Sequence, residues 1–169
     1  MRLFAVDTDV LSPIANAGEN VALRALGRAP VILTDVVWQE CSGGDGRLSA
    51  ERLALATAWC GGPTVIQPGS PEAGTAATLL AQGDLEVGEI SILSWAAHHA
   101  DVVPVLYERH ALLRALEEMP LLPVLSIHGF LAELVLLGLP RSAAKTISRS
   151  YCAGAHWKKG VRPQPPLWW

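Results

Sequence analysis

The regular alternation of short apolar runs with helical patterns is the feature that most restricts the fold of this chain of 169 residues. Strand-like runs are expected at 2–6, 31–33, 64–67, 102–106 and 122–125. Strands that alternate with helices are typical of parallel strands joined by helical crossovers. The sequence therefore predicts an α/β fold with a mainly parallel sheet, either doubly wound or arranged as a three-layer α/β/α sandwich.

The helical patterns have starts and ends that can be recognised from proline, glycine and acidic residues. Helices are expected at 21–26, 36–40, 48–59, 71–82, 85–98, 108–118, 129–137 and 140–150, and a further one follows Asp9. Within the apolar run at 102–106, Pro104 cannot donate a backbone hydrogen bond, so it predicts an edge strand or a bulge there.

The charge of the chain is unevenly distributed. Residues 1–140 hold all 16 acidic residues and 7 of the 13 Lys and Arg, a net charge of −9, whereas residues 141–169 hold the other 6 basic residues and no acid, a net charge of +6. We expect one domain over residues 1–150 and a basic tail, rich in tryptophan and proline, over residues 151–169. A basic end on an acidic body indicates a polyanionic or acidic partner.

The composition predicts a cytoplasmic protein that has no contact with the membrane. Half of the residues are hydrophobic, but no apolar run is long enough to span a bilayer, and the first residues do not resemble a signal peptide. The three cysteines lack the spacing of a zinc site, and their odd number favours reduced thiols.

Asp7 directly follows the first apolar run. A carboxylate at the end of a buried strand is costly unless it is paired, and a divalent metal ion is one such partner. The neighbouring Thr8 and Asp9 have a simpler interpretation, because either can cap the following helix.

Three further acidic residues, Glu40, Glu89 and Glu108, stand at strand-end or helix-start positions. These positions face one edge of a parallel sheet, where ligands bind in open α/β folds. Taken singly, each glutamate is explained as a helix N-terminal acid that complements the helix dipole. Together with Asp7 they favour a site, because clustered carboxylates raise each other's pKa and Mg²⁺ or Mn²⁺ relieves that repulsion.

Four segments resemble motifs of the PIN-domain nucleases, specifically the small prokaryotic toxin-type members. The segment 6–11 resembles the first motif, and 34–40 resembles the second, which ends in an acid. The segment 85–93 is similar to the Gly-Glu helix of one branch, and 105–110 stands where the family has an Asp-containing motif. The order and spacing match over about residues 1–147.

This resemblance implies a three-layer α/β/α sandwich and cleavage of RNA that depends on Mg²⁺ or Mn²⁺. The catalytic carboxylates would be Asp7, Glu40, Glu89 and Glu108, of which Asp7, Glu89 and Glu108 would bind the metal, with Thr8 and Asp9 in support. Family members commonly form dimers and bind an antitoxin, so the implied partners are an RNA substrate, an antitoxin protein and a second copy of the chain.

One position departs from the family pattern. Members with the Gly-Glu helix usually carry two aspartates after the fourth strand, whereas this chain has Tyr107-Glu108. Tyr107 supplies no carboxylate, and Glu108 is one methylene longer than aspartate. Two hypotheses follow: an active endoribonuclease of the toxin type, or a catalytically silent PIN-like module that binds RNA or a protein partner.

The C-terminal region carries a basic stripe, because Arg141, Lys145 and Arg149 recur every four residues. Beyond it, Lys158 and Lys159 follow a tryptophan, a mixture that suits phosphate contacts and stacking on bases. The stripe is also compatible with a solvated helix face, and the tail with packing on its own domain or docking on a larger assembly.

Overall fold

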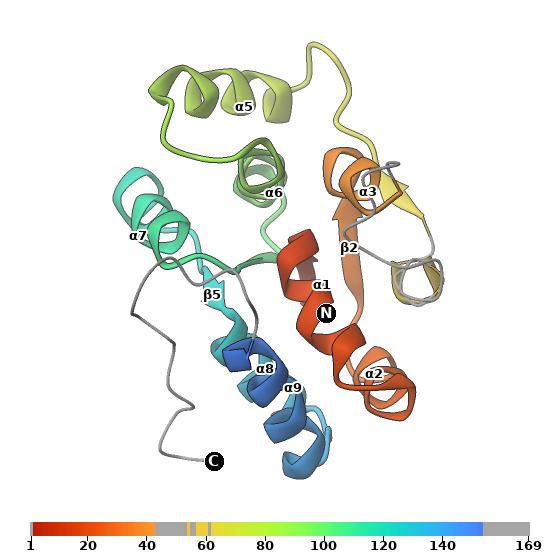
Figure 1. Ribbon diagram of the computed structural model, residues 1–169. Helices are drawn as coiled ribbons and strands as arrows, with labels where there is room; N and C mark the ends of the chain where they lie inside the picture. The colour runs from red at the N-terminus through yellow and green to blue at the C-terminus, as the bar shows by residue number, and fades with distance from the viewer. Residues whose placement is uncertain (1, 43–53, 55–56, 61, 154–169) are drawn as a thin grey trace.

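The computed structural model describes residues 2–42, 54, 57–60 and 62–153. Its centre is a sheet of five parallel strands in the order β3-β2-β1-β4-β5 (Figure 1). The strands are β1 (Leu3–Val6), β2 (Val31–Thr34), β3 (Pro63–Thr64), β4 (Val102–Leu106) and β5 (Leu125–Ser126). The predicted α/β fold with a parallel sheet is confirmed.

Helices cover both faces of this sheet, which makes a three-layer α/β/α sandwich. Those whose bounds are described are α1 (Thr8–Asn16), α2 (Glu19–Leu26), α3 (Asp35–Ser42), α5 (Pro71–Gln82), α6 (Val87–His98), α7 (Arg109–Glu118), α8 (Ile127–Leu136) and α9 (Arg141–Ala153). On one side α6 packs on the sheet with α3 and α5 against it, and on the other α1 packs with α2 and α9 (Figure 1). None of the described helices is long and apolar enough to cross a membrane.

The core is built on the two central strands. Every residue of β4 is buried, and Phe4 of β1 packs on Phe130 of α8 with 5.1 Å between the ring centroids. Trp59 completes this aromatic cluster at 6.2 Å from Phe130, and its indole Nε1 donates to the carbonyl of Ala29 at 3.0 Å. A close-packed centre of this kind holds the strand ends, and the residues that follow them, in place.

The outer strands differ from the sequence prediction. β3 has only two residues and ends at Thr64, and β5 begins at Leu125, three residues later than expected. Pro104 was expected at an edge or a bulge, yet it lies in a central strand and pairs with Ala5. The reason is local: β5 pairs only with Val105 and Leu106, so on that side the ladder requires no N–H from residue 104.

The helices agree more closely with prediction. The bounds of α5 coincide with the expected 71–82, but α9 continues to Ala153 instead of ending at 150. The extension is explained by packing, because Tyr151 is buried and continues the apolar face of Ala144 and Ile147. Most of the helix expected at 48–59, and the tail from 154 onward, lie outside the described residues.

Candidate active site

The strand order reverses direction at the centre of the sheet, which is where open α/β folds form a crevice. From β1 the chain builds outward through β2 to β3, and it then crosses to β4 and β5 on the other side of β1. Ligands in open α/β sheets bind at the carboxyl ends of the strands where the order reverses. Asp7 follows β1 at this edge, and Glu108 follows the neighbouring β4, whose Val105 is in register with Val6.

Asp7 is a buried acid at the centre of the site, with 9% of its surface exposed. It is the N-cap of α1, and its Oδ1 accepts a hydrogen bond of 2.7 Å from the backbone N–H of Thr8. Burial raises the pKa of Asp7 well above its ordinary value, and the charges of Asp9, Glu40 and Glu89 raise it further. The hydrogen bond from the Thr8 N–H lowers the pKa of Asp7, but by less than burial and the neighbouring charges raise it.

Thr8 links Asp7 to the second acid, Glu40. The Thr8 side chain is fully buried, and its hydroxyl donates to Glu40 Oε2 at 2.9 Å. The Cys41 thiol lies 3.8 Å from the same hydroxyl oxygen and donates to it. Thr8, predicted as a supporting residue, thus holds the Glu40 carboxylate of α3 beside the end of β1.

The first turn of α6 approaches both carboxylates closely. A Cβ atom placed on Gly88 would lie 3.1 and 3.2 Å from the two carboxylate oxygens of Glu40, and 3.4 Å from Asp7 Oδ1. The side chains of Asp7 and Glu40 therefore border the same small space over Gly88, although Asp7 caps α1 and Glu40 belongs to α3.

Two buried hydroxyls hold α6 against β2 at this point. Thr34 Oγ1 and Ser91 Oγ lie 2.6 Å apart, and Ser91 also donates to the carbonyl of Gly88 at 2.7 Å. Because the Ser91 proton is committed to Gly88, the Thr34 hydroxyl is the donor within the pair. These bonds set the distance between the α6 turn and the carboxylates.

Glu89 and Glu108 extend the acidic site outward. Glu89 is 5% exposed, and its Oε2 accepts from the backbone N–H of Glu86 at 3.0 Å. Burial raises the pKa of Glu89, and the charges of Glu86 and Glu108 add to that effect, while the Glu86 N–H and His110 oppose it. Glu108 is the exposed N-cap of α7, so it lies at the rim of the site and not at its buried centre.

An aromatic pair borders the acids at the same rim. The rings of Tyr107 and Tyr151 meet edge to face at 4.9 Å, and the Tyr151 hydroxyl donates to the Tyr107 carbonyl at 3.4 Å. Burial raises the pKa of Tyr107 to about 12, with the charges of Asp9 and Glu108 as smaller causes. The C-terminal end of α9 therefore reaches the edge of the acidic site.

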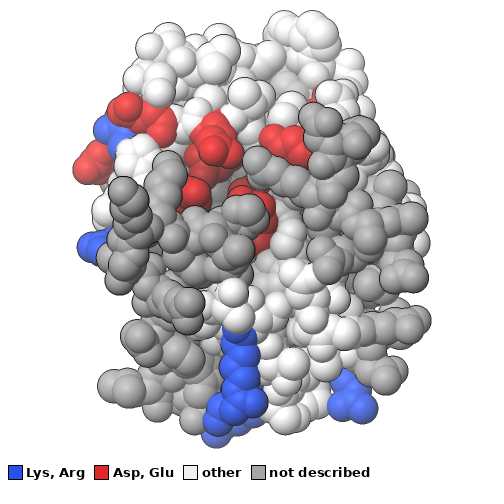
Figure 2. All heavy atoms as spheres, viewed as in Figure 1, with Lys and Arg blue, Asp and Glu red and all other residues white. Residues whose placement is uncertain are grey.

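Acidic and basic side chains both lie on this face of the molecule. Figure 2 shows Asp and Glu side chains in its upper half, with some Lys and Arg beside them at the left edge and others at the bottom, toward α9. On α9, Arg141, Lys145 and Arg149 are all exposed, as a basic stripe requires. Lys158 and Lys159, also predicted to bind nucleic acid, lie outside the described residues.

Sequence reasoning did not assign a role to Gly88, Glu86 or the Thr34–Ser91 pair. Glu86 carried a signal, since it stands three residues before Glu89, the spacing of a capping box. The other three, Gly88, Thr34 and Ser91, become informative only when α6 is seen beside β2 and α3, because their contacts join residues 48 to 81 positions apart.

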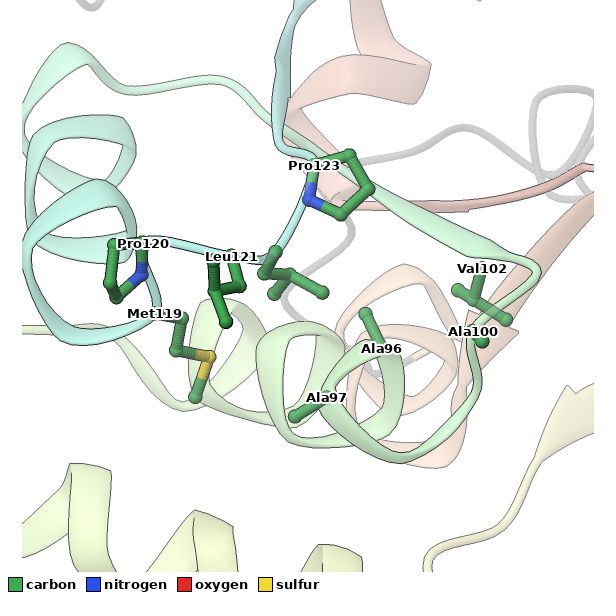
Figure 3. Close-up of a pocket in the computed structure, with 9 residues that line it drawn as sticks. Ala96, Ala97, Ala100, Val102, Met119, Pro120, Leu121 and Pro123 are labelled. Atoms are coloured by element: carbon green, nitrogen blue, oxygen red, sulfur yellow. The ribbon is translucent and has the colours of Figure 1, made fainter.

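A hollow of about 480 Å³ lies at the opposite end of α6 (Figure 3). It is lined by Ala96, Ala97, Ala100, Val102, Met119, Pro120, Leu121, Leu122 and Pro123. All nine side chains are apolar, so this hollow offers no group for acid–base or metal chemistry. The carboxylates beside Gly88 remain the better candidate for a reactive site.

The oxygen ligands that the acidic site offers are of the kind that a hard metal ion prefers. Carboxylate oxygens are the ligands that Mg²⁺ and Mn²⁺ prefer, and the space over Gly88 is bordered by two carboxylates whose repulsion a cation would relieve. Within the described residues, no three His, Cys, Asp or Glu side chains are grouped closely enough to hold a metal ion as they stand. Asp7 and Glu40 would be the first two ligands, and Glu89 the next candidate.

No family model, curated protein or solved structure matches this chain. The assignment of function therefore depends on the residues of the site and on their geometry.

The buried acids predict how stability depends on pH in the absence of divalent cations. The folded state holds the Asp7 proton more tightly than the unfolded chain, whose aspartate pKa is about 4. This contribution is fully present below the unfolded value and is lost as pH rises through the folded pKa. We expect the free energy of unfolding, measured by urea titration with EDTA, to fall more between about pH 4 and pH 8 in the wild type than in Asp7→Asn.

The difference between the two proteins is the relevant quantity, because burial lowers the pKa of His128 and that group acts in the opposite direction over part of this range. Parallel pH profiles for the wild type and Asp7→Asn would contradict the prediction.

Proposed function

We propose that this protein is a metal-dependent endoribonuclease that hydrolyses RNA phosphodiester bonds at the carboxyl edge of its sheet. The observation that carries the proposal is the convergence of the Asp7 and Glu40 carboxylates on Gly88, at the end of the central strand. A buried acid that is repelled by a half-buried one, at the edge where α/β sheets bind ligands, is costly to the fold, and a bound cation would offset that cost.

Each residue of the site has a role in this proposal. Asp7 and Glu40 would hold Mg²⁺ or Mn²⁺ together with Glu89, and Thr8 keeps Glu40 oriented through its 2.9 Å hydrogen bond. Such an ion, when bound, activates a water molecule and stabilises the charge that develops on a phosphate. Glu108 at the rim would act on the approaching substrate or its water shell.

The proposed substrate is RNA. An acidic centre repels a polyanion, so cationic side chains elsewhere on the surface must hold the phosphates of such a substrate. Arg141, Lys145 and Arg149 are exposed along α9, and the end of that helix reaches the acidic rim through Tyr151. Phosphates bound along the stripe would lead the strand toward the carboxylates. In line with the toxin-type resemblance, we propose a cytoplasmic location and, as protein partners, an antitoxin and a second copy of the chain.

A second function is supported by a specific observation. Tyr107 occupies a position where the resembling family has a carboxylate, and Glu108 is exposed at the rim and not buried beside Asp7. A site with one acid fewer fits a catalytically silent module that binds RNA or a protein partner through the same face.

The deciding experiment is RNA cleavage by the purified protein at stoichiometric concentration, with end-labelled single-stranded and hairpin RNA. We expect fragments with Mn²⁺ or Mg²⁺, no fragments with EDTA, and recovery when the metal is restored. RNA binding without cleavage under every metal condition would support the silent module instead. Absence of both binding and cleavage would contradict the two functions together.

A further inference from the structure

Gly88 is a glycine that its own backbone does not require. It is the second residue of α6, and its φ lies outside the left-handed region in which glycine is favoured. Glycine in a helix costs up to about 1 kcal/mol relative to alanine. The reason for glycine at this position must therefore come from what surrounds it.

The surroundings of Gly88 are two carboxylates. An added Cβ would lie 3.1 and 3.2 Å from the oxygens of Glu40, closer than an ordinary van der Waals contact, and 3.4 Å from Asp7 Oδ1. Gly74, in the first half of α5, also has an ordinary backbone, and a Cβ there would meet nothing within 4 Å. Gly129 in α8 would also be crowded, but by the apolar side chain of Leu125 at 3.2 Å, so Gly88 is distinguished by the carboxylates that it meets and not by crowding alone.

The first turn of α6 is also tied to β2. Ser91 donates to the Gly88 carbonyl at 2.7 Å and is itself held by Thr34 of β2 at 2.6 Å. A larger residue at 88 could therefore be accommodated only by displacement of the Glu40 or Asp7 side chains, which form the site.

We propose that Gly88 is the positioning residue of the carboxylate site: because it has no side chain, the Glu40 and Asp7 carboxylates can lie against the first turn of α6, in the arrangement in which they would share a divalent cation. The inference rests on the proposed function and adds to it the residue that determines whether the two acids can share an ion.

The test is Mn²⁺ binding by calorimetry for the wild type, Gly88→Ala, the matched control Gly74→Ala, Glu40→Asp and the double variant Gly88→Ala/Glu40→Asp. We expect Gly88→Ala to bind Mn²⁺ at least about tenfold more weakly, in the range known for groups that orient metal ligands. Gly74→Ala should bind as the wild type does. The double variant should bind more tightly than Gly88→Ala, because an aspartate side chain in place of Glu40 is one methylene shorter and withdraws from the new methyl group.

Rescue of Mn²⁺ affinity by Glu40→Asp is the decisive measurement, since it tests whether the loss in Gly88→Ala arises from contact between the new methyl group and residue 40. Urea titration of each metal-free variant accompanies it, because a loss or rescue of Mn²⁺ affinity reports on the site only where the variants remain folded under the conditions of the calorimetry. Equal affinity of the wild type and Gly88→Ala, or no gain in the double variant, would overturn the role of Gly88 and leave the proposed function in place. No saturable binding by the wild type would overturn the proposed function, and this role with it.

Discussion

Asp7→Asn should reduce metal-dependent RNA cleavage by about 10³-fold or more and Mn²⁺ affinity by at least about 100-fold, while the domain stays folded. The substitution removes the charge of a buried acid at the centre of the site but keeps its shape. Asparagine remains a good N-cap, so the 2.7 Å bond from the Thr8 N–H can persist. Cleavage assays and calorimetry measure the loss, and circular dichroism reports the fold.

The same substitution should stabilise the metal-free protein at neutral pH by about 1 kcal/mol, because it removes a buried charge that is repelled by its neighbours. This opposite response of stability and activity is what separates a functional acid from a structural one. Asp101→Asn is the matched control, since Asp101 is an exposed aspartate that precedes β4 at the other edge of the sheet. Retained cleavage in Asp7→Asn, or an equal loss in Asp101→Asn, would contradict the assignment of Asp7.

Local patterns predicted the frame of this fold well because its central elements are strongly biased. β1 and β4 are continuous apolar runs, and α5 begins with Ser70 as N-cap and ends at Gly83 in the left-handed conformation, so its bounds could be predicted from sequence alone. β3 and β5 were placed less well, because strands of two residues are defined by their neighbours rather than by their own composition.

The candidate site could be predicted only in part, for a related reason. That Asp7 and Glu40 approach the same edge follows from parallel topology, which the strand–helix alternation implies. Their convergence on Gly88 depends on how closely α6 packs on α3 and β2, a tertiary distance that no local pattern encodes. The end of α9 was recognisable in principle, since Ala144, Ile147 and Tyr151 share one helical face that continues beyond residue 150.

Neutralising the basic stripe of α9, by Arg141→Gln, Lys145→Gln and Arg149→Gln together, should weaken RNA binding in proportion to the phosphate contacts that are lost. Each contact with a single strand contributes roughly 0.7 to the slope of log affinity against log salt, so the triple variant should lower that slope by about 2. The side chains are exposed, so stability should change little. Fluorescence anisotropy with labelled RNA at several salt concentrations measures the slope.

The control for that variant must change the same charge at another place on the surface. Arg2, Arg24 and Arg28 are exposed and lie before β1 and on or just after α2, and their replacement by glutamine also removes three positive charges. If the stripe binds phosphates directly, the two triple variants separate, because only the α9 variant loses contacts and lowers the slope. If the acidic body merely repels RNA through its net charge, the two triple variants should weaken RNA binding equally. Their slopes of log affinity against log salt should then be the same. The stripe is not part of the carboxylate site, so the α9 variant should bind Mn²⁺ as the wild type does. If it also cleaves RNA, but only at high RNA concentration, the stripe acts in substrate binding and the carboxylates act in the reaction.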